Sequence, residues 1–491
     1  MSVEPHSQNA TAPTPAIAPG AEDIDVRRVA AELGARGLDP RIPALVPGFD
    51  APFFQAGLAG YSDAAMRIVA RRQGCPFCVT EALLDRTLLA GGRGFSKADL
   101  GELHDNIPGG REDHPLAGQI MGSDPKEMAA AALKMIEQRA RNDRAYRRLA
   151  YDGALGPGGE GVTALRLPGG EQLDPAEGLG DDDACDIACE DSCAPDSTCA
   201  PSNPDDDTCE SLIDQINRLD AADSTELSTL AAVADFAAPG AMLASPAPAT
   251  FEVVDVNLAC PVKKVDRRAR GGHWLTEPDG AIEILEAVRE SLPPNIICAV
   301  KLRRAYDDTP EMAANFERIF DAAYRIGYAW TTVHARTVQQ KYIGPSRWTF
   351  LRDLVRRHPG KIVFGSGDVW DVNEIFRMIA YTGVSAVSVA RGCIGNPWIF
   401  RQARELLAGR PALPPSLAEQ RRVLREHFEL SLVVNRGMRR GDEATSKLMR
   451  KFGIRFSQHH PRAEEVRRRM IAINSMRDWL AVLEQFYSDT P

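Results

Sequence analysis

The residues in this chain whose types and spacing could do chemistry are a cysteine and the two lysines that follow it. Residues 251–257 are apolar and rich in β-formers, which predicts a buried strand, and Pro261 cannot extend that strand because it has no N–H. Cys260 therefore lies at the C-terminal end of a strand, just before Lys263 and Lys264. In (β/α)8 barrels this end carries the catalytic residues. Most cysteines beside apolar strands, however, are small core residues.

Alternating strand and helix patterns must position this thiol. The predicted strands are Phe53–Gly60, Phe77–Glu81, His114–Met121, Phe251–Asn257, Asn295–Arg303, Tyr328–His334, Lys361–Gly365 and Ser385–Ala390. Helical patterns separate them, the clearest at Pro278–Ser291 and Pro310–Ile326. Eight such repeats predict an α/β protein built on a (β/α)8 TIM barrel. The residues at successive strand ends are Leu58, Glu81, Gln119, Cys260, Lys301, His334, Asp368 and Arg391.

Shifts in composition divide the 491-residue chain. We predict a disordered leader (1–46), a first barrel part (47–150), an acidic insert (151–250), a second barrel part (251–408) and a C-terminal helical domain (416–491). The leader has neither a basic region nor an apolar stretch typical of a signal peptide, and no apolar run is long enough to span a membrane. We therefore expect a cytoplasmic monomer that does not contact a membrane.

Charge is distributed unevenly along the chain. The formal net charge is −10, but residues 152–250 carry 21 acidic and 2 basic residues, which leaves +9 on the rest. Residues 401–491 carry 18 basic and 11 acidic residues. Such a basic end suits a polyanionic partner, although a solvated helical surface is the commoner meaning of arginine-rich helices.

Five of the ten cysteines lie in the acidic insert, at Cys185, Cys189, Cys193, Cys199 and Cys209. This spacing contains no CxxC pair and has no nearby histidine, so it does not resemble common zinc sites. We expect a flexible insert without a metal, and iron–sulfur or zinc binding by these cysteines stays open as the less favoured alternative. Because it follows a helix and precedes a strand, the insert should lie on the barrel face opposite the catalytic end.

The sequence NLACPVKKV, from Asn257, resembles the catalytic-cysteine motif N-x-G-C-P of the tRNA-dihydrouridine synthases, with Ala259 in place of glycine. Dihydroorotate dehydrogenases have a similar motif. The sequences HART, from His334, and QKYIG, from Gln340, are similar to the synthases' H-x-R-T and Q-x-Y-x-G and favour that family. The CPVKKV run resembles the corresponding segment of the bacterial B-type subgroup.

Other segments resemble the synthases with substitutions. Residues 56–63 follow A-P-M-A-G-x-[ST]-D, with Gly57 and Leu58 replacing proline and methionine. Ser366 replaces asparagine in G-N-G-D, and Ala390 replaces glycine before Arg391. Residues 449–452, MRKF, resemble M-R-K-H of the family's tRNA-binding helical domain.

The resemblance implies an enzyme that uses FMN, reduced by NADPH, to convert a uridine of tRNA to 5,6-dihydrouridine. It implies that hydride reaches C6 from the flavin and that Cys260 protonates C5. The residues implied to hold FMN are Gly57, Leu58, Ala59, Gln119, Lys301, His334, Ser366, Gly367, Asp368, Ala390 and Arg391. Those expected to contact the substrate are Glu81, Asn257, Lys263 and Arg336.

Two alternatives stay open at this point. One is a dihydroorotate dehydrogenase-like flavin oxidoreductase that acts on a small molecule. The other is an RNA-binding relative that has lost catalysis, an idea motivated by Gly57, Ala259, Ser366 and Ala390, where the chain departs from the family's residues.

Overall fold

Eight parallel strands close into a barrel in this computed structural model, which describes residues 18, 20–89, 111–137, 251–261, 271–435 and 441–487. Each strand pairs with the next in sequence, and the eighth pairs with the first. The strands are β1 (Phe53–Gln55), β2 (Cys78–Leu84), β3 (Leu116–Met121), β4 (Val253–Leu258), β5 (Ile297–Arg303), β6 (Trp330–His334), β7 (Val363–Ser366) and β8 (Ala386–Val389). The predicted TIM barrel is confirmed.

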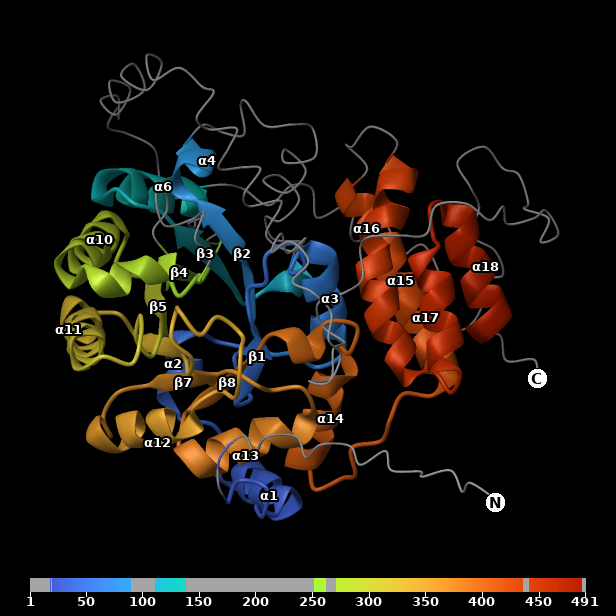
Figure 1. The fold of residues 1–491 in the computed structure, drawn as a ribbon, viewed down its shortest axis with the longest axis horizontal. Helices are drawn as coiled ribbons and strands as arrows, with labels where there is room; N and C mark the ends of the chain where they lie inside the picture. Colours follow the sequence, from blue (N-terminus) through green and yellow to red (C-terminus); the bar gives the residue numbers. More distant parts are fainter. Residues whose placement is uncertain are drawn as a thin grey trace, which may run out of the picture.

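A helix follows each strand along the chain, and the longer helices surround the barrel (Figure 1). The helices that follow the eight strands, in order, are α3 (Ala64–Arg72), α4 (Asp85–Leu89), α6 (Pro125–Glu137), α10 (Pro278–Ser291), α11 (Pro310–Ile326), α12 (Trp348–Arg357), α13 (Val372–Thr382) and α14 (Trp398–Leu407). Both α10 and α11 have the predicted bounds. Each begins at a proline, and α11 ends at Gly327 in the left-handed conformation that favours glycine.

Two predicted strand ends are wrong by more than two residues. The first strand ends at Gln55, and residues 56–60 form a turn. The second strand continues to Leu84, so Glu81 lies inside β2 rather than at its end. The register between β2 and β3 shifts between Val79 and Ala82, and this irregularity breaks the alternation that a sequence pattern relies on.

Aromatic side chains fill the barrel interior near the N-terminal ends of the strands. The Trp330 and Phe364 rings lie 5.2 Å apart between centroids, and the Phe54 and Phe364 rings lie 5.4 Å apart. Phe49, which precedes β1, stacks on Phe77 at 4.7 Å. This end of the barrel is therefore a packed core rather than a pore.

The segment before β1 closes that end of the barrel. It contains α1 (Val26–Arg36) and α2 (Arg41–Leu45), and Ile42, Val46 and Phe49 join the barrel's aromatic cluster as fully buried residues. The predicted disordered leader is therefore wrong over residues 20–46, because a few apolar side chains suffice to anchor a polar segment. Residues 1–17 lie outside the described part of the chain.

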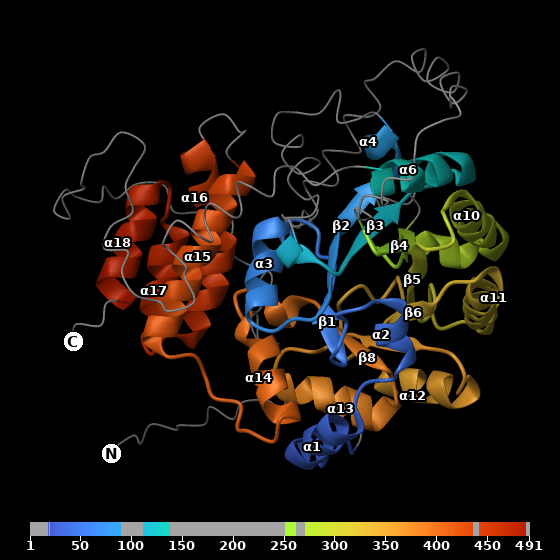
Figure 2. The same cartoon turned by 180° about the vertical axis from the view of Figure 1, so that it is seen from behind.

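In the described part of the chain, four α-helices after the barrel form the predicted C-terminal helical domain, which lies beside α3 (Figures 1 and 2). They are α15 (Leu417–Asn435), α16 (Gly441–Phe456), α17 (Ala463–Ile471) and α18 (Met476–Tyr487). Lys451 of α16 donates a hydrogen bond to the carbonyl of Gly60 and lies 4.7 Å from the Tyr61 ring. The MRKF segment thus ties this domain to the turn after β1.

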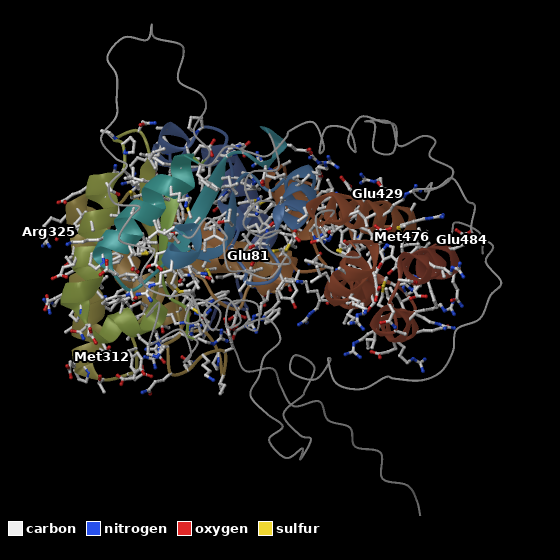
Figure 3. All side chains as sticks on the ribbon, turned by 90° about the horizontal axis from the view of Figure 1, so that it is seen from above. Glu81, Met312, Arg325, Glu429, Met476 and Glu484 are labelled. Carbon is white, nitrogen blue, oxygen red and sulfur yellow. The ribbon has the colours of Figure 1, made fainter. Side chains whose placement is uncertain are left out.

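Seen from above, Met312 and Arg325 of α11 lie at one end of the molecule, and Glu429 and Glu484 of the C-terminal helices lie at the other (Figure 3). Glu81 of β2 lies between them. No helix among the described residues combines the length and apolar character needed to cross a membrane. The acidic insert falls outside the described residues, so its predicted position stays a prediction.

Candidate active site

The barrel interior changes from apolar to polar toward the C-terminal ends of the strands. On β4, Val253 belongs to the apolar interior, and because side chains alternate in a strand, Asp255 and Asn257 lie on the same face. The register places Gln119 of β3 opposite Asp255, and Lys301 of β5 opposite Asn257. Three adjacent strands thus bring these four polar side chains together.

Hydrogen bonds link three of these side chains in one direction. Gln119 Nε2 donates to Asp255 Oδ2 at 2.7 Å, and Asn257 Nδ2 donates to Gln119 Oε1 at 2.8 Å. The backbone N–H of Ala259 then donates to Asn257 Oδ1 at 2.9 Å. All three side chains are buried, so these bonds offset the cost of removing their polar groups from water.

Cys260 lies two residues beyond β4 and is half-buried. The peptide before it is held on both sides, because Arg303 Nε donates to the Ala259 carbonyl at 2.9 Å while Asn257 accepts from the Ala259 N–H. Lys301 and Arg303 lie close enough to Cys260 for electrostatic interaction. The thiol thus lies at the C-terminal end of the barrel as predicted, but the described charges beside it are Lys301 and Arg303, and the predicted neighbours Lys263 and Lys264 lie outside the described residues.

The short helix η3 (Gly271–Thr276) returns the chain to this thiol. Gly272 donates its N–H to the Cys260 carbonyl at 2.8 Å. A Cβ atom on Gly272 would lie 2.9 Å from that oxygen, and Gly271 has a positive φ of 38°. Two glycines therefore let η3 lie directly against Cys260. Lys263, predicted to contact the substrate, lies in the gap between residues 261 and 271 of the described chain.

Burial and neighbouring charges set the ionisation of two of the site's groups. Burial raises the pKa of Asp255 to about 6, although the Gln119 hydrogen bond and the Lys301 charge act in the opposite direction. Burial also lowers the pKa of Lys301, against the attraction of Asp255. The attraction between the Asp255 carboxylate and the Lys301 ammonium group partly offsets, at neutral pH, the free energy that burial costs each charge.

His334 at the end of β6 is neutral. Burial, together with the positive charges of Arg303 and Arg336, holds its pKa well below the usual value. The Arg336 backbone N–H points at His334 Nδ1 at 3.3 Å. The neutral ring therefore carries its proton on Nε2, which makes that nitrogen a hydrogen-bond donor.

Arg336 and Asp368 are paired with each other. Arg336 Nη2 donates to both carboxylate oxygens of Asp368, at 2.6 and 2.7 Å, and also to the Gly344 carbonyl at 2.6 Å. Only 3% of the Arg336 surface is exposed. The protein thus occupies Nε and Nη2 of the arginine predicted to contact the substrate, whereas its buried Nη1 has no hydrogen-bond partner among the described residues.

The loops after β7 and β8 lie side by side because these strands pair, with Ser366 opposite Ser388. Gly367 and Asp368 both have positive φ, at 116° and 53°. Arg391 is half-buried next to this turn and lies 4.4 Å from the Trp370 ring. Turns of this kind, beside an arginine at this place in a barrel, suit a phosphate group.

Residues 57–59 form the corresponding turn after β1 and are half-buried. Leu58 donates its N–H to Ser62 Oγ at 2.8 Å, which fixes the turn. A Cβ atom on Gly57 would lie 2.3 Å from the Thr80 carbonyl of β2. Any larger residue here would therefore require this backbone to shift.

Asp255 is the residue that our interpretation of the sequence missed. Its signal was present, because a carboxyl group inside an apolar strand two positions before Asn257 needs a buried partner. The partner, Gln119, lies on a strand that is distant in sequence, so only the register of the barrel identifies it.

Comparison with known proteins decides the family. The profile of the family described as dihydrouridine synthase (Dus) matches residues 218–490, which is more than half of the chain. The chain belongs to the dihydrouridine synthase family. The match covers the second barrel part and the C-terminal helices, and it separates the chain from the dihydroorotate dehydrogenases, which the NxxCP motif alone could not do.

Individual relatives of the Dus family agree with this assignment. The "Probable tRNA-dihydrouridine synthase" of Mycobacterium leprae is 35% identical over 191 residues, covering 38% of this chain and 48% of that protein. The "tRNA-dihydrouridine synthase B" of Proteus vulgaris is 27% identical over 240 residues, covering 48% of this chain and 71% of that protein. The chain thus spans about half the length of the mycobacterial relative.

Among solved structures, morphinone reductase in complex with tetrahydroNAD is similar at 14% identity with a TM-score of 0.35, covering 75% of this chain and 89% of that chain. At that score the likeness adds nothing to the barrel already described.

Proposed function

We propose that this Dus family member reduces a uridine of tRNA to 5,6-dihydrouridine, with FMN as its cofactor and NADPH as the electron donor. The observation that carries the proposal is the position of Cys260, half-buried at the same end of the barrel as Gln119, Asn257 and Lys301. In a member of this family, that arrangement supports a proton donor beside groups that would hold a flavin.

The donor set at this end of the barrel fits FMN. Leu58 and Ala59 would contact the ring system, and Gln119, Lys301 and His334 Nε2 would offer hydrogen bonds to its ring heteroatoms. The half-buried ammonium group of Lys301 suits an electron-rich ring edge. Residues 366–368, Ala390 and Arg391 would hold the phosphate. When bound, FMN would supply the hydride that adds to C6 of the uracil.

Cys260 would complete the reduction as a general acid. Hydride addition at C6 leaves negative charge that is relieved by a proton at C5, so one hydride and one proton together saturate the 5,6 double bond. The thiolate left behind would be stabilised by Lys301 and Arg303, which already interact electrostatically with Cys260. The thiol lies at the C-terminal end of the barrel beside two cations. This position suits both the donation of the proton and the stabilisation of the thiolate.

The remaining polar residues would hold the base and the RNA. Asn257 would orient the uracil through its amide group, and Glu81, which is 8% exposed in β2, would contribute from the neighbouring wall. The target base must leave its stack to enter the barrel. Arginines on the C-terminal helices, among them Arg422, Arg468 and Arg477, are exposed and would hold phosphates with an affinity that falls as salt rises.

Substitution of Cys260 tests this proposal. We expect Cys260→Ala to bind flavin as the wild type does but to form dihydrouridine in tRNA about 100-fold more slowly, the usual loss for a general acid. Cys298→Ala is the matched control, because that thiol is 1% exposed and bonded to Arg289, away from the site. The measurement is dihydrouridine formed in unmodified tRNA by the purified enzyme.

Two outcomes would contradict the proposal. A purified wild-type protein without flavin absorbance would remove the cofactor and favour the inactive RNA-binding alternative. A Cys260→Ala enzyme as fast as the wild type would remove the thiol from the reaction while leaving the family's activity intact.

A further inference from the structure

Asp255 stands at the start of the buried hydrogen-bond chain that ends beside Cys260. Its Oδ2 accepts from Gln119, Gln119 accepts from Asn257, and Asn257 accepts from the Ala259 N–H. Oδ1 of Asp255 is buried and accepts no hydrogen bond from the described residues. Asp255 as a whole is 5% exposed, so bulk water has little access to its carboxyl group.

The two ends of this chain give it a single direction. An ionised carboxylate can only accept hydrogen bonds, so the amide NH2 group of Gln119 must face Asp255. A backbone N–H can only donate, so the carbonyl oxygen of Asn257 must face Ala259. Both ends require the same orientation of the two amides between them. Each amide then keeps one N–H that these bonds do not use.

We propose that Asp255 is a positioning residue that fixes the Gln119 and Asn257 amides as donors toward the site. It would act on the flavin through Gln119, and on the base through Asn257. An N–H presented by Asn257 favours a pyrimidine with a carbonyl group at the contacted position, which uridine has, over one with an amino group there, which cytidine has. This inference rests on the proposed function, because it assumes that FMN and a pyrimidine occupy the site.

The first test measures FMN binding to the apoprotein, without tRNA. We expect Asp255→Ala to raise the FMN dissociation constant about tenfold, since Gln119 loses the acceptor that orients it. Asp255→Asn keeps a carbonyl oxygen at that position, and we expect its dissociation constant to stay within about threefold of the wild type. Should Asp255→Ala not fold, Asp255→Leu removes the acceptor without leaving a cavity and carries the same expectation.

Asp85→Ala is the matched control. Asp85 is also a buried carboxyl group at the barrel, but it accepts from the Ser123 N–H at 3.3 Å and is not bonded to Gln119. Its substitution should leave the FMN dissociation constant unchanged. A loss of affinity equal to that of Asp255→Ala would mean that any buried carboxylate matters, and it would overturn the inference.

A double-substitution cycle separates positioning from direct contact. If Asp255 acts through Gln119, Asp255→Ala should have no further effect on FMN affinity in a Gln119→Ala background. Additive losses would overturn the inference and leave the proposed function standing. A wild-type protein that binds no FMN would overturn both.

Discussion

The two ends of the barrel interior are built from the same strands but from opposite kinds of side chain. Near the N-terminal ends, Phe54, Phe77, Trp330 and Phe364 pack ring against ring beneath α2. Near the C-terminal ends, Asp255, Asn257, Gln119 and Lys301 occupy the same inward face, and hydrogen bonds link the first three. On β7, Phe364 and Ser366 mark this change two residues apart, about 7 Å along the strand.

This difference separates the source of stability from the source of chemistry. The aromatic end gains free energy by removing apolar surface from water. The polar end gains little, because its hydrogen bonds mainly offset desolvation, but it holds several functional groups in fixed orientations. Substitutions at the two ends should therefore change different measured quantities.

The largest effect expected is on stability, at the aromatic end. Phe364 is fully buried and contacts the rings of Phe49, Phe54 and Trp330. We expect Phe364→Ala to lower the free energy of unfolding by about 3–5 kcal/mol, measured by denaturant titration. Protein that remains folded should bind FMN with unchanged affinity, and a matching loss of affinity would show that the two ends are coupled.

A smaller effect, on binding alone, is expected at the polar end. We expect Lys301→Met to weaken FMN binding about tenfold, or about 1.4 kcal/mol, without lowering the free energy of unfolding. Burial lowers the pKa of Lys301, so its charge is lost at a lower pH than that of an ordinary lysine. Wild-type affinity should therefore fall as pH rises before ordinary lysines titrate.

The Lys301→Met variant has no charge to lose at this position, so its FMN affinity should show no such fall. Fluorescence titration of the apoprotein with FMN from pH 7 to alkaline pH makes the comparison. Parallel pH curves for the two proteins would contradict the role given to Lys301.

The smallest effect concerns a charge at the aromatic end. His114, before β3, contacts Glu252, before β4, with 2.8 Å between Nδ1 and Oε1. Burial lowers the pKa of His114, but the hydrogen bond and the charge of Glu252 outweigh burial and raise it overall. The pair therefore stabilises the fold below pH ~6.5, and its contribution is lost as pH rises through the raised pKa.

Glu252→Gln should accordingly lower the free energy of unfolding at pH 5.5 by up to about 1 kcal/mol, and by less at pH 9. FMN affinity should not change at either pH. A change in FMN affinity without a change in stability would place this pair with the polar end instead.

Local signals in the sequence predicted the architecture well where they were sufficient. The bounds of α10 and α11 follow from proline at the first turn and, for α11, from Gly327 at its end. Cys260 was placed correctly at a strand end because Pro261 must interrupt the ladder.

Features that depend on distant partners could not be predicted in this way. Residues 20–46 look like a polar leader until the barrel provides the apolar surroundings in which Ile42 and Val46 are buried. The position of Glu81 depends on an irregularity in the pairing of β2 with β3. The pairing of Arg336 with Asp368 joins two loops that motif matching had treated separately.

The hydrogen bond between Gly272 and the Cys260 carbonyl has a consequence for the connection between these two residues. This contact joins the two edges of the described chain on either side of residues 262–270, so it fixes the distance that the connection must span. Closure entropy grows slowly with length, about 0.6 kcal/mol for each doubling. Changes in the length of this connection should therefore cost little free energy, because one contact fixes both of its ends.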